Sequence, residues 1–310
     1  MLISIAIPCY YSEKNLQIVV DDIRQAFAEH PEHDYQIILV NDGSKDDTFG
    51  VISELCKHDR KIVGIDLSRN FGQASARMAS LPYIDGKCAV FMDDDGQHPA
   101  RDLFRLVDKL DEGYDVVMAH LKHKKHSIFK RITSAMTRKI AEFIGNRPKG
   151  IIYSSFFAMS RLVIDELQKY KSPFPSAMGY TMRVTERFAN VDIEHQERIS
   201  GHSGYNLKRL IALWLNGVTN FSLVPLRMAS FLGFLTAIAG FAMGIYFIVR
   251  KLIFPQILSG YTSLISVVLL IGGVIMVLLG LIGEYIGRIY MTISNMPQFT
   301  IREVKNGEAP

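Results

Sequence analysis

Short apolar runs alternate with longer amphipathic segments over the first part of the chain. The segments between the runs place apolar residues at helical spacing, as in LQIVVDDIRQAFAEH at residues 16–30. Strands that alternate with helices predict an α/β domain, with a mainly parallel sheet covered by helices on both faces. The runs that we expect to form strands cover residues 3–7, 35–40, 61–67, 88–92 and 114–119.

The C-terminal third contains two long apolar runs without a charged residue, at residues 228–249 and 262–282. Each has about the 20 residues that a helix needs to cross the hydrocarbon core of a bilayer. Two core helices of a soluble domain are the alternative, but such domains seldom contain two charge-free runs of this length separated by a short loop. We therefore expect a two-helix transmembrane hairpin at residues 228–284, followed by a C-terminal tail at residues 285–310.

Lysine and arginine residues near the two apolar runs are unevenly distributed. One side carries Lys208, Arg209, Arg227, Arg288, Arg302 and Lys305, and the other side carries Arg250 and Lys251. Basic residues accumulate on the cytoplasmic side of membrane proteins, so we expect both termini and the α/β domain in the cytoplasm. The first apolar run lacks the basic segment and the cleavage site of a signal peptide, so we expect a strand there.

The length of 310 residues exceeds one typical domain, as expected for a domain followed by membrane helices. The net charge of +4 is small. The three cysteines, Cys9, Cys56 and Cys88, have neither metal-ligand nor redox spacing. This fits a reducing compartment and gives no functional signal.

A basic segment at residues 122–147 predicts an interfacial helix. Its apolar residues recur at helical spacing and are Ile128, Phe129, Ile132, Met136, Ile140 and Phe143. Such a helix can lie on an anionic membrane surface, although an ordinary solvated helix remains an alternative. No nucleic-acid recognition motif accompanies the charge, so we expect no nucleic-acid binding. A second amphipathic helix is expected beside the membrane at residues 205–227.

Polar clusters follow each of the first four predicted strands. They cover residues 8–13, 41–47, 68–73 and 93–97. In open α/β sheets, ligands bind in the crevice outside the carboxyl ends of the strands. A single cluster such as NDGS or DDG is usually a turn or a helix cap. Four clusters in equivalent positions predict one shared site.

The fourth cluster, MDDDGQHP at residues 92–99, contains three adjacent carboxylates. Two like charges about 4 Å apart repel by about 1 kcal/mol in water, and by more in a partly buried cleft. A hard divalent cation, Mg²⁺ or Mn²⁺, would offset that repulsion. If the strand continues this far, Asp93 and Asp95 point to one face and Asp94 to the other. The chain has no GxxxxGK[ST] phosphate loop, which argues against an ATPase or kinase of that class.

The segments IPCYYSEKNL, VNDGSKDDT, LSRNFGQ and MDDDGQHP, in this order, resemble the glycosyltransferase family 2 domain, which has the GT-A fold. The resemblance covers residues 1–204. The segments ERISGHSGYNLKRLIALWLNG at residues 197–217 and GEYIGRIYMTISNMPQFTIRE at residues 283–303 resemble one subgroup of this family. That subgroup loads a sugar onto polyprenyl phosphate and includes bactoprenol glucosyltransferases and dolichol-phosphate mannose synthases.

The resemblance implies an inverting glycosyltransferase (EC 2.4.1.-) with a divalent cofactor, Mg²⁺ or Mn²⁺. It would move a hexose or an N-acetylhexosamine from a nucleotide diphosphate sugar, with UDP favoured, to undecaprenyl phosphate. The product would be a β-linked polyprenyl-phosphate sugar at the cytoplasmic face of a bacterial-type plasma membrane. The resemblance also implies contact with membrane lipid and assembly as a homo-oligomer.

The resemblance also assigns site residues. The nucleoside pocket would be lined by Pro8, Tyr10, Glu13 and Asp42, with Asp42 accepting from the base. Asp93 and Asp95 would be the acids of the DxD motif, Asp95 and Gln97 reaching the metal and Asp93 lying near the ribose and the metal. Asp94 would belong to the nucleotide-sugar set. Arg198 would stabilise the phosphates with Ser203 beside it, and Lys130 and Arg131 would meet the lipid phosphate.

The chain departs from the family pattern at several positions. In YSSFFAMSR, Ser155 occupies the position of a common acidic residue and Phe157 that of an arginine. Tyr11 and Ser12 replace residues of the common YNEE segment, and Gly204 stands where a basic residue is frequent. We hypothesise that Ser154, Ser155, Phe156 and Phe157 shape a pocket for a sugar other than mannose, such as an N-acetylated hexosamine.

Three other functions compete with this one. The first is a catalytically inactive, membrane-anchored nucleotide-sugar-binding scaffold, suggested by Ser155. The second is a transferase to another lipid acceptor. The third, a processive polysaccharide synthase, is disfavoured because the chain has no QxxRW segment and a single tryptophan, Trp214.

Overall fold

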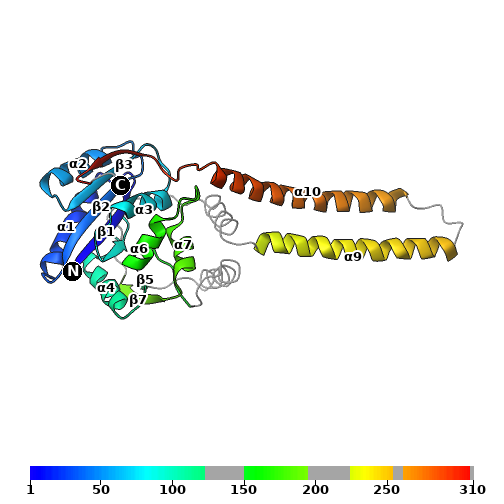
Figure 1. Ribbon diagram of the computed structural model, residues 1–310, viewed down its shortest axis with the longest axis horizontal. Coiled ribbons are helices and arrows are strands. Elements are labelled where there is room, and N and C mark those ends of the chain that lie inside the picture. The colour runs from blue at the N-terminus through cyan, green and yellow to red at the C-terminus, as the bar shows by residue number, and fades with distance from the viewer. Residues whose placement is uncertain (123–149, 195–223, 254–260, 308–310) are drawn as a thin grey trace. The chain divides into compact units, whose positions relative to one another are not determined.

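The computed structural model describes residues 1–122, 150–194, 224–253 and 261–307 (Figure 1). The chain divides into two compact units. The sheet unit comprises Met1–Leu207 together with Asn295–Pro310, and the hairpin unit comprises Lys208–Ser294. The C-terminal residues therefore belong with the α/β domain and do not form a separate tail.

The described residues of the sheet unit form a sheet of eight strands in the order β7-β5-β6-β4-β1-β2-β3-β8. The strands are β1 (Leu2–Cys9), β2 (Asp34–Asn41), β3 (Ile62–Leu67), β4 (Cys88–Phe91), β5 (Val116–Lys122), β6 (Phe157–Ser160), β7 (Phe188–Glu194) and β8 (Ile301–Lys305). Strands β3, β2, β1 and β4 run parallel, while β6 and β8 run antiparallel to their neighbours β4 and β3. This mixed α/β sheet confirms the predicted fold class, and all five predicted strands are present.

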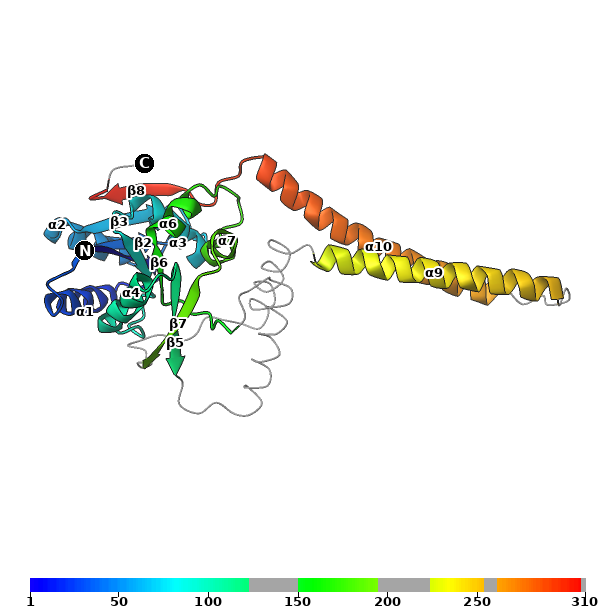
Figure 2. The ribbon, with the colours of Figure 1, turned by 60° about the horizontal axis from the view of Figure 1, so that its bottom comes forward.

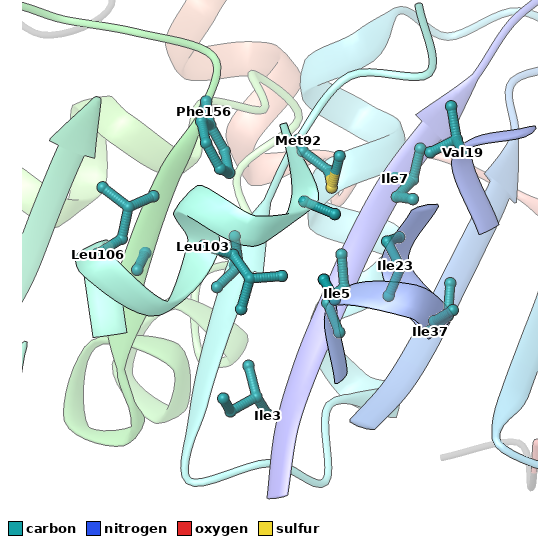
Figure 3. Close-up of a cluster of buried hydrophobic side chains, with 14 of the residues drawn as sticks. Ile3, Ile5, Ile7, Val19, Ile23, Ile37, Met92, Leu103, Leu106 and Phe156 are labelled. Atoms are coloured by element: carbon teal, nitrogen blue, oxygen red, sulfur yellow. The ribbon is translucent and has the colours of Figure 1, made fainter. Parts of the chain in front are cut away.

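Helices pack on the sheet along the apolar faces that the sequence pattern predicts. They are α1 (Leu16–Ala28), α2 (Thr48–His58), α3 (Gln73–Ser80), α4 (Leu103–Asp111), α6 (Arg161–Gln168) and α7 (Ala177–Val184), with short 3-10 turns η1 (Leu81–Tyr83) and η2 (Ala100–Asp102). One core cluster joins β1 to α1 and α4 through residues that include Ile3, Ile5, Ile7, Val19, Ile23, Leu103 and Leu106 (Figure 3). Seven of the eight β1 residues are buried, so this central strand is covered on both faces.

The C-terminal strand β8 covers the edge of the sheet beside β3 (Figure 2). Gly64 pairs with Lys305 and Ile65 with Val304 in an antiparallel register. Just beyond the strand, the Asn306 side-chain amide donates to the carbonyls of Cys56, Asp59 and Ile62 at 2.6, 3.2 and 3.0 Å. Strand β3 is therefore paired on both sides, and β8 forms the edge of the described sheet.

The hairpin unit contains two long helices, α9 (Val224–Ile253) and α10 (Tyr261–Ile293). Both are long and apolar enough to cross a membrane, over Ala229–Tyr246 and Ile271–Ile293, and neither window is buried within the protein. A core helix of a soluble domain would be mostly buried, so this exposure argues against the soluble alternative. Helix α10 continues past residue 284 to Ile293, and Glu284 and Arg288 form an i, i+4 ion pair at 2.5 Å within it.

Two predicted helices fall on parts of the chain that the structure describes only at their ends. Of the basic segment at residues 122–147, only Lys122 is described, and it ends β5. Of the juxtamembrane segment at residues 205–227, only residues 224–227 are described, and they begin α9. Both helices, like the domain boundaries at residues 204 and 227, stay predictions.

Candidate active site

The polar loops after β1, β2, β3 and β4 contact one another at the carboxyl edge of the sheet. The Tyr11 N–H in the first loop donates to Ser44 Oγ in the second at 3.0 Å. The Gln73 side chain, where the third loop enters α3, donates to Asp93 Oδ1 in the fourth loop at 2.6 Å. Asp42 joins the second loop to the third, as described below. The four clusters therefore form one site, in the crevice where open α/β sheets bind ligands.

Asp93 is held by helix α3. Strand β4 ends at Phe91, so the alternation expected for a strand that continued to Asp95 does not apply. Asp93 Oδ1 instead accepts from Gln73 Nε2 at 2.6 Å and from Arg77 Nη2 at 3.1 Å. The Arg77 side chain is 15% exposed and that of Asp93 21% exposed, so this ion pair is partly buried.

The other two carboxylates of the fourth loop have different partners. Asp94 Oδ2 accepts from Ser12 Oγ and from the Tyr10 N–H, both in the first loop. Asp95 Oδ1 accepts from the Gln97 N–H at 3.1 Å. Each carboxylate thus has its own hydrogen-bond donors. These contacts offset part of a repulsion that amounts to about 1 kcal/mol for two charges 4 Å apart in water.

Burial raises the pKa of the Asp94 carboxyl, and the hydrogen bond from Ser12 only partly opposes that shift. The neutral form is therefore favoured by folding, so Asp94 stabilises the fold below its unfolded pKa of about 4 and loses this contribution as the pH rises through the folded pKa.

The variant Asp94→Asn is expected to be more stable than the wild type at pH 7, with the gain disappearing near pH 4. Asparagine keeps both hydrogen bonds, because both use a single carboxylate oxygen. Thermal unfolding of chelator-treated protein between pH 4 and pH 8 measures this effect. Equal melting temperatures at pH 7, or a larger gain at pH 4, would contradict it.

Asp42 ties the second loop to the third. Its two oxygens accept from the backbone N–H groups of Phe71 and Gly72, at 2.7 and 2.9 Å. Burial raises the pKa of the Asp42 carboxyl, and the two N–H donors partly lower it. Gly43 lies at φ +64°, and a Cβ there would come within 2.3 Å of the Arg69 backbone, so only glycine fits this contact. A carboxylate has about four acceptor positions, which leaves room for the predicted bond from a base.

The other residues predicted for the nucleoside pocket differ in exposure. Tyr10 and Tyr11 are 50% and 51% exposed, and their rings meet edge to face with centroids 4.7 Å apart. Pro8 is buried within β1, so it shapes the pocket through the backbone. Glu13 Oε2 accepts from the Asp47 N–H at 3.0 Å, which directs the Glu13 carboxylate toward the start of α2. The rings of the two tyrosines are therefore accessible to a ligand.

Tyr11 has a left-handed backbone conformation, with φ +57°. Asparagine tolerates this region better than a bulky residue does, so Tyr11→Asn is expected to stabilise the fold by about 0.5 to 1 kcal/mol. The variant Tyr11→Ala is the matched control, because it removes the ring without relieving the backbone. Chemical denaturation of the two variants tests this, and equal stabilities would contradict it.

The segment proposed to contact the sugar is only partly exposed. Ser154 and Ser155 lie at the surface of the site, with Ser154 Oγ accepting from the Phe156 N–H at 3.2 Å. Phe156 is fully buried. Phe157 is 2% exposed and stacks on Phe91 with ring centroids 4.8 Å apart. The two serines are therefore partly exposed, whereas the Phe157 ring is buried and cannot reach a ligand directly.

Three residues that contact Asp93 had no role assigned to them from the sequence, although Gln73 belongs to the third polar cluster. Arg77 and Gln73 hold Asp93 from α3, and His98 Nδ1 accepts from the Asp93 N–H at 3.1 Å. His98 is buried against the Phe156 ring, so it packs inside the site and does more than cap a turn. The available signal was Arg77 itself, the one charged residue in the stretch QASARMAS at residues 73–80.

The predicted metal ligands offer hard oxygen donors, as Mg²⁺ and Mn²⁺ prefer. Asp93, Asp95 and Gln97 lie in one short loop. Among the described residues, no group of three or more His, Cys, Asp or Glu side chains is arranged to hold a metal ion. Mg²⁺ is commonly bound by one or two carboxylates together with substrate phosphates, so this donor set fits a metal shared with a bound diphosphate.

Four predicted site residues lie outside the described residues. They are Arg198 and Ser203, assigned to the donor phosphates, and Lys130 and Arg131, assigned to the lipid phosphate. Their roles stay predictions.

Comparison with known proteins identifies related sequences over both units. Residues 4–168 match the family described as Glycosyl transferase family 2, and residues 224–289 match the GtrB C-terminal hairpin. The chain is 31% identical over 317 residues to the SfII prophage-derived bactoprenol glucosyl transferase of Shigella flexneri, covering 99% of each chain. It is 32% identical over 314 residues to the undecaprenyl-phosphate 4-deoxy-4-formamido-L-arabinose transferase of Proteus mirabilis, covering 99% of this chain and 95% of the relative.

Among solved structures, the chain is similar to mannosyl-3-phosphoglycerate synthase from Rubrobacter xylanophilus. The TM-score is 0.52 at 16% sequence identity, and the match covers 71% of this chain and 72% of that one. At this level of identity the similarity supports the fold alone.

Proposed function

The chain belongs to glycosyl transferase family 2, and from that premise we propose that it transfers a sugar from a nucleotide diphosphate sugar to polyprenyl phosphate. One observation carries this proposal. The chain aligns over almost its whole length, apolar hairpin included, with relatives named for bactoprenol and undecaprenyl phosphate. The acceptor is then a lipid, and the hairpin would keep the sheet unit at the membrane face where that lipid lies.

In the proposed reaction, an oxygen of the lipid phosphate attacks the anomeric carbon of the donor sugar. The bond from that carbon to the donor diphosphate breaks, and its electron pair leaves with the nucleoside diphosphate. Attack opposite the leaving group inverts the anomeric centre and gives a β-linked polyprenyl-phosphate sugar. The second pKa of a phosphate monoester is about 6, so the acceptor is largely dianionic at neutral pH. It needs no strong general base, which agrees with a serine at position 155.

The residues of the crevice would have different roles in binding the donor. The exposed rings of Tyr10 and Tyr11 would stack on the base, and Asp42 would accept from it. Asp95, with Gln97 beside it, would hold a divalent cation, which supplies neutralising charge at the leaving diphosphate. We propose a UDP-sugar donor. Ser154 and Ser155 would contact the sugar.

Further contacts are proposed outside the described residues. Arg198 and Ser203 would bind the donor phosphates, while Lys130 and Arg131 would bind the lipid phosphate and anionic lipid headgroups. The site would face the cytoplasm, with both termini on that side of a bacterial-type plasma membrane. Assembly as a homo-oligomer is part of the same proposal.

A donor screen tests this function. Purified full-length protein in nanodiscs that contain undecaprenyl phosphate and Mn²⁺ is incubated with UDP-glucose, UDP-N-acetylglucosamine, UDP-N-acetylgalactosamine, UDP-galactose and GDP-mannose in turn. We expect release of nucleoside diphosphate with a UDP-hexose or a UDP-N-acetylhexosamine, and only when the lipid phosphate is present. Strict use of GDP-mannose would exclude the proposed pocket for another sugar.

The rival function is an inactive scaffold that binds nucleotide sugars, and Ser155 is the residue that favours it. The same preparation separates the two functions. Tight UDP binding without turnover for any donor would support the scaffold, whereas turnover that requires lipid phosphate would exclude it. The contacts of Asp93 and Asp95 argue for the enzyme, because they keep both carboxylates at the site.

A further inference from the structure

Arg77 lies in the last turn of α3 with its side chain 15% exposed. The residues around it on this short helix are small or apolar and are buried, namely Ser75, Ala76, Met78, Ala79 and Ser80. A guanidinium in such surroundings requires polar partners, because burying an unpaired charge is unfavourable. Those partners belong to the active-site crevice.

The Arg77 guanidinium joins three parts of the site. Nη2 donates to Asp93 Oδ1 at 3.1 Å and to the Ser155 carbonyl at 3.4 Å. The guanidinium also lies over the Phe157 ring, 5.4 Å from its centroid. A planar guanidinium is suited to this combination, since it donates in its plane and stacks on its face. One side chain therefore links the acidic loop to the segment that carries the two serines.

Arg77 also determines which oxygen of Asp93 is engaged. Gln73, one helical turn earlier on α3, donates to the same oxygen, Oδ1. Within the parts of the chain that the structure describes, no side chain donates a hydrogen bond to Asp93 Oδ2. Holding Oδ1 from α3 thus leaves Oδ2 available for a ligand. The His98 ring, which accepts the Asp93 N–H, secures the backbone of the same residue.

We propose that Arg77 is a positioning residue for transfer, which holds Asp93 and residues 154–156 at a set distance from each other. Asp93 belongs to the side of the site assigned to the donor diphosphate, and Ser154 and Ser155 to the side assigned to the sugar. The proposal rests on the glycosyl transfer proposed above. It assigns to Arg77 no contact with substrate, and its effect passes through Asp93 and the Ser155 carbonyl.

Two variants of Arg77 distinguish the effect of its positive charge from the effect of its planar, forked side chain. Arg77→Met keeps an unbranched side chain that can pack on the Phe157 ring, but it removes the donors and the charge. Arg77→Lys keeps the charge, but it lacks the planar fork that reaches a carboxylate and a carbonyl together. The matched control is Arg24→Met, because Arg24 also forms a partly buried ion pair, with Asp59 at 3.0 Å, away from the crevice.

The variants are compared as full-length proteins in nanodiscs by three measurements, namely the melting temperature, Mn²⁺ binding by electron paramagnetic resonance, and kinetics with the best donor. For Arg77→Met we expect kcat to fall by about 30- to 100-fold with KM for the donor within about threefold of the wild type, as for a lost positioning contact. Mn²⁺ alone should bind as well or up to about tenfold tighter, because a positive charge beside Asp93 is gone. Arg77→Lys should restore Mn²⁺ binding to the wild-type value and kcat only in part.

If Arg77 only stabilises the fold, the three measurements give a different result. In that case the melting temperature, the Mn²⁺ affinity and kcat of Arg77→Met all fall together, and those of Arg24→Met fall in the same way. The proposal is overturned by that pattern, or by a kcat for Arg77→Met within twofold of the wild type. If the wild type itself turns over no donor, the proposed function fails, and the Mn²⁺ titration still decides whether Arg77 acts on the acidic loop.

Discussion

Replacement of Asp95 by asparagine is expected to lower kcat for sugar transfer by about a thousandfold while the protein stays folded. Asparagine keeps an oxygen that can accept the Gln97 N–H, so the loop retains the hydrogen bond that shapes it. The charge is lost, and with it the hard ligand expected to hold the cation on the leaving diphosphate. Melting temperature and single-turnover rates with a saturating donor measure the two effects separately.

The control for this variant is Asp108→Asn, which changes an exposed carboxylate on α4. It should leave kcat within twofold of the wild type. A chelator should abolish wild-type turnover, and added Mn²⁺ should restore it. Retention of more than a tenth of the wild-type kcat by Asp95→Asn would contradict the assigned role of this carboxylate.

Truncation of the chain after Ser294 is expected to destabilise the sheet unit by several kcal/mol and to abolish nucleotide binding. Strand β3 is buried along its whole length, and its outer edge is paired only by β8 in the described part of the sheet. Arg302 donates to the Ser68 carbonyl at 2.8 Å and lies 3.5 Å from Asp66. Asp66 in turn accepts from the Asn41 side chain at 2.7 Å, which connects the tail to the loops of the site.

A point variant keeps this second prediction testable if the truncated chain aggregates. Asn306→Asp retains a residue that tolerates the left-handed conformation at φ +55° but removes the amide that donates to three carbonyls. We expect it to cost about 1 to 2 kcal/mol of unfolding free energy. A chain that ends at Gly307 is the matched truncation control. Equal stability of the chains ending at Ser294 and Gly307 would show that β8 does not support the sheet.

Local sequence patterns were sufficient to predict the central strands of the sheet. Each of the strands β1 to β4 is an apolar run rich in residues that favour strands, and each is followed by turn residues. Strand β8 could not be predicted in this way. Its short segment IREVK is polar at several positions, and its partner β3 lies more than two hundred residues earlier in the chain. Pairing at that separation has no local signal. The tail was therefore expected to be a separate segment, whereas it completes the sheet.

The site was predictable to a similar degree. The polar clusters that contain Asp42 and Asp93 were identified because they follow strands, whereas the roles of these two residues came from the family resemblance and stay predictions. The contacts that hold them could not be predicted, because they come from neighbouring helices and from the backbone. Arg77 approaches Asp93 from α3, and the N–H groups of Phe71 and Gly72 occupy Asp42.

The mass of the lipid product tests the central claim most directly. Wild-type protein in nanodiscs with undecaprenyl phosphate and Mn²⁺ is incubated with the donor selected by the screen. The lipids are then extracted, and their masses are measured by mass spectrometry. Asp95→Asn is treated in the same way for comparison. We predict polyprenyl phosphate that has gained one sugar residue and no second phosphate, formed by the wild type and not by the variant. Lipid without sugar for every donor, or lipid that has gained a sugar together with a second phosphate, would contradict the proposed transfer.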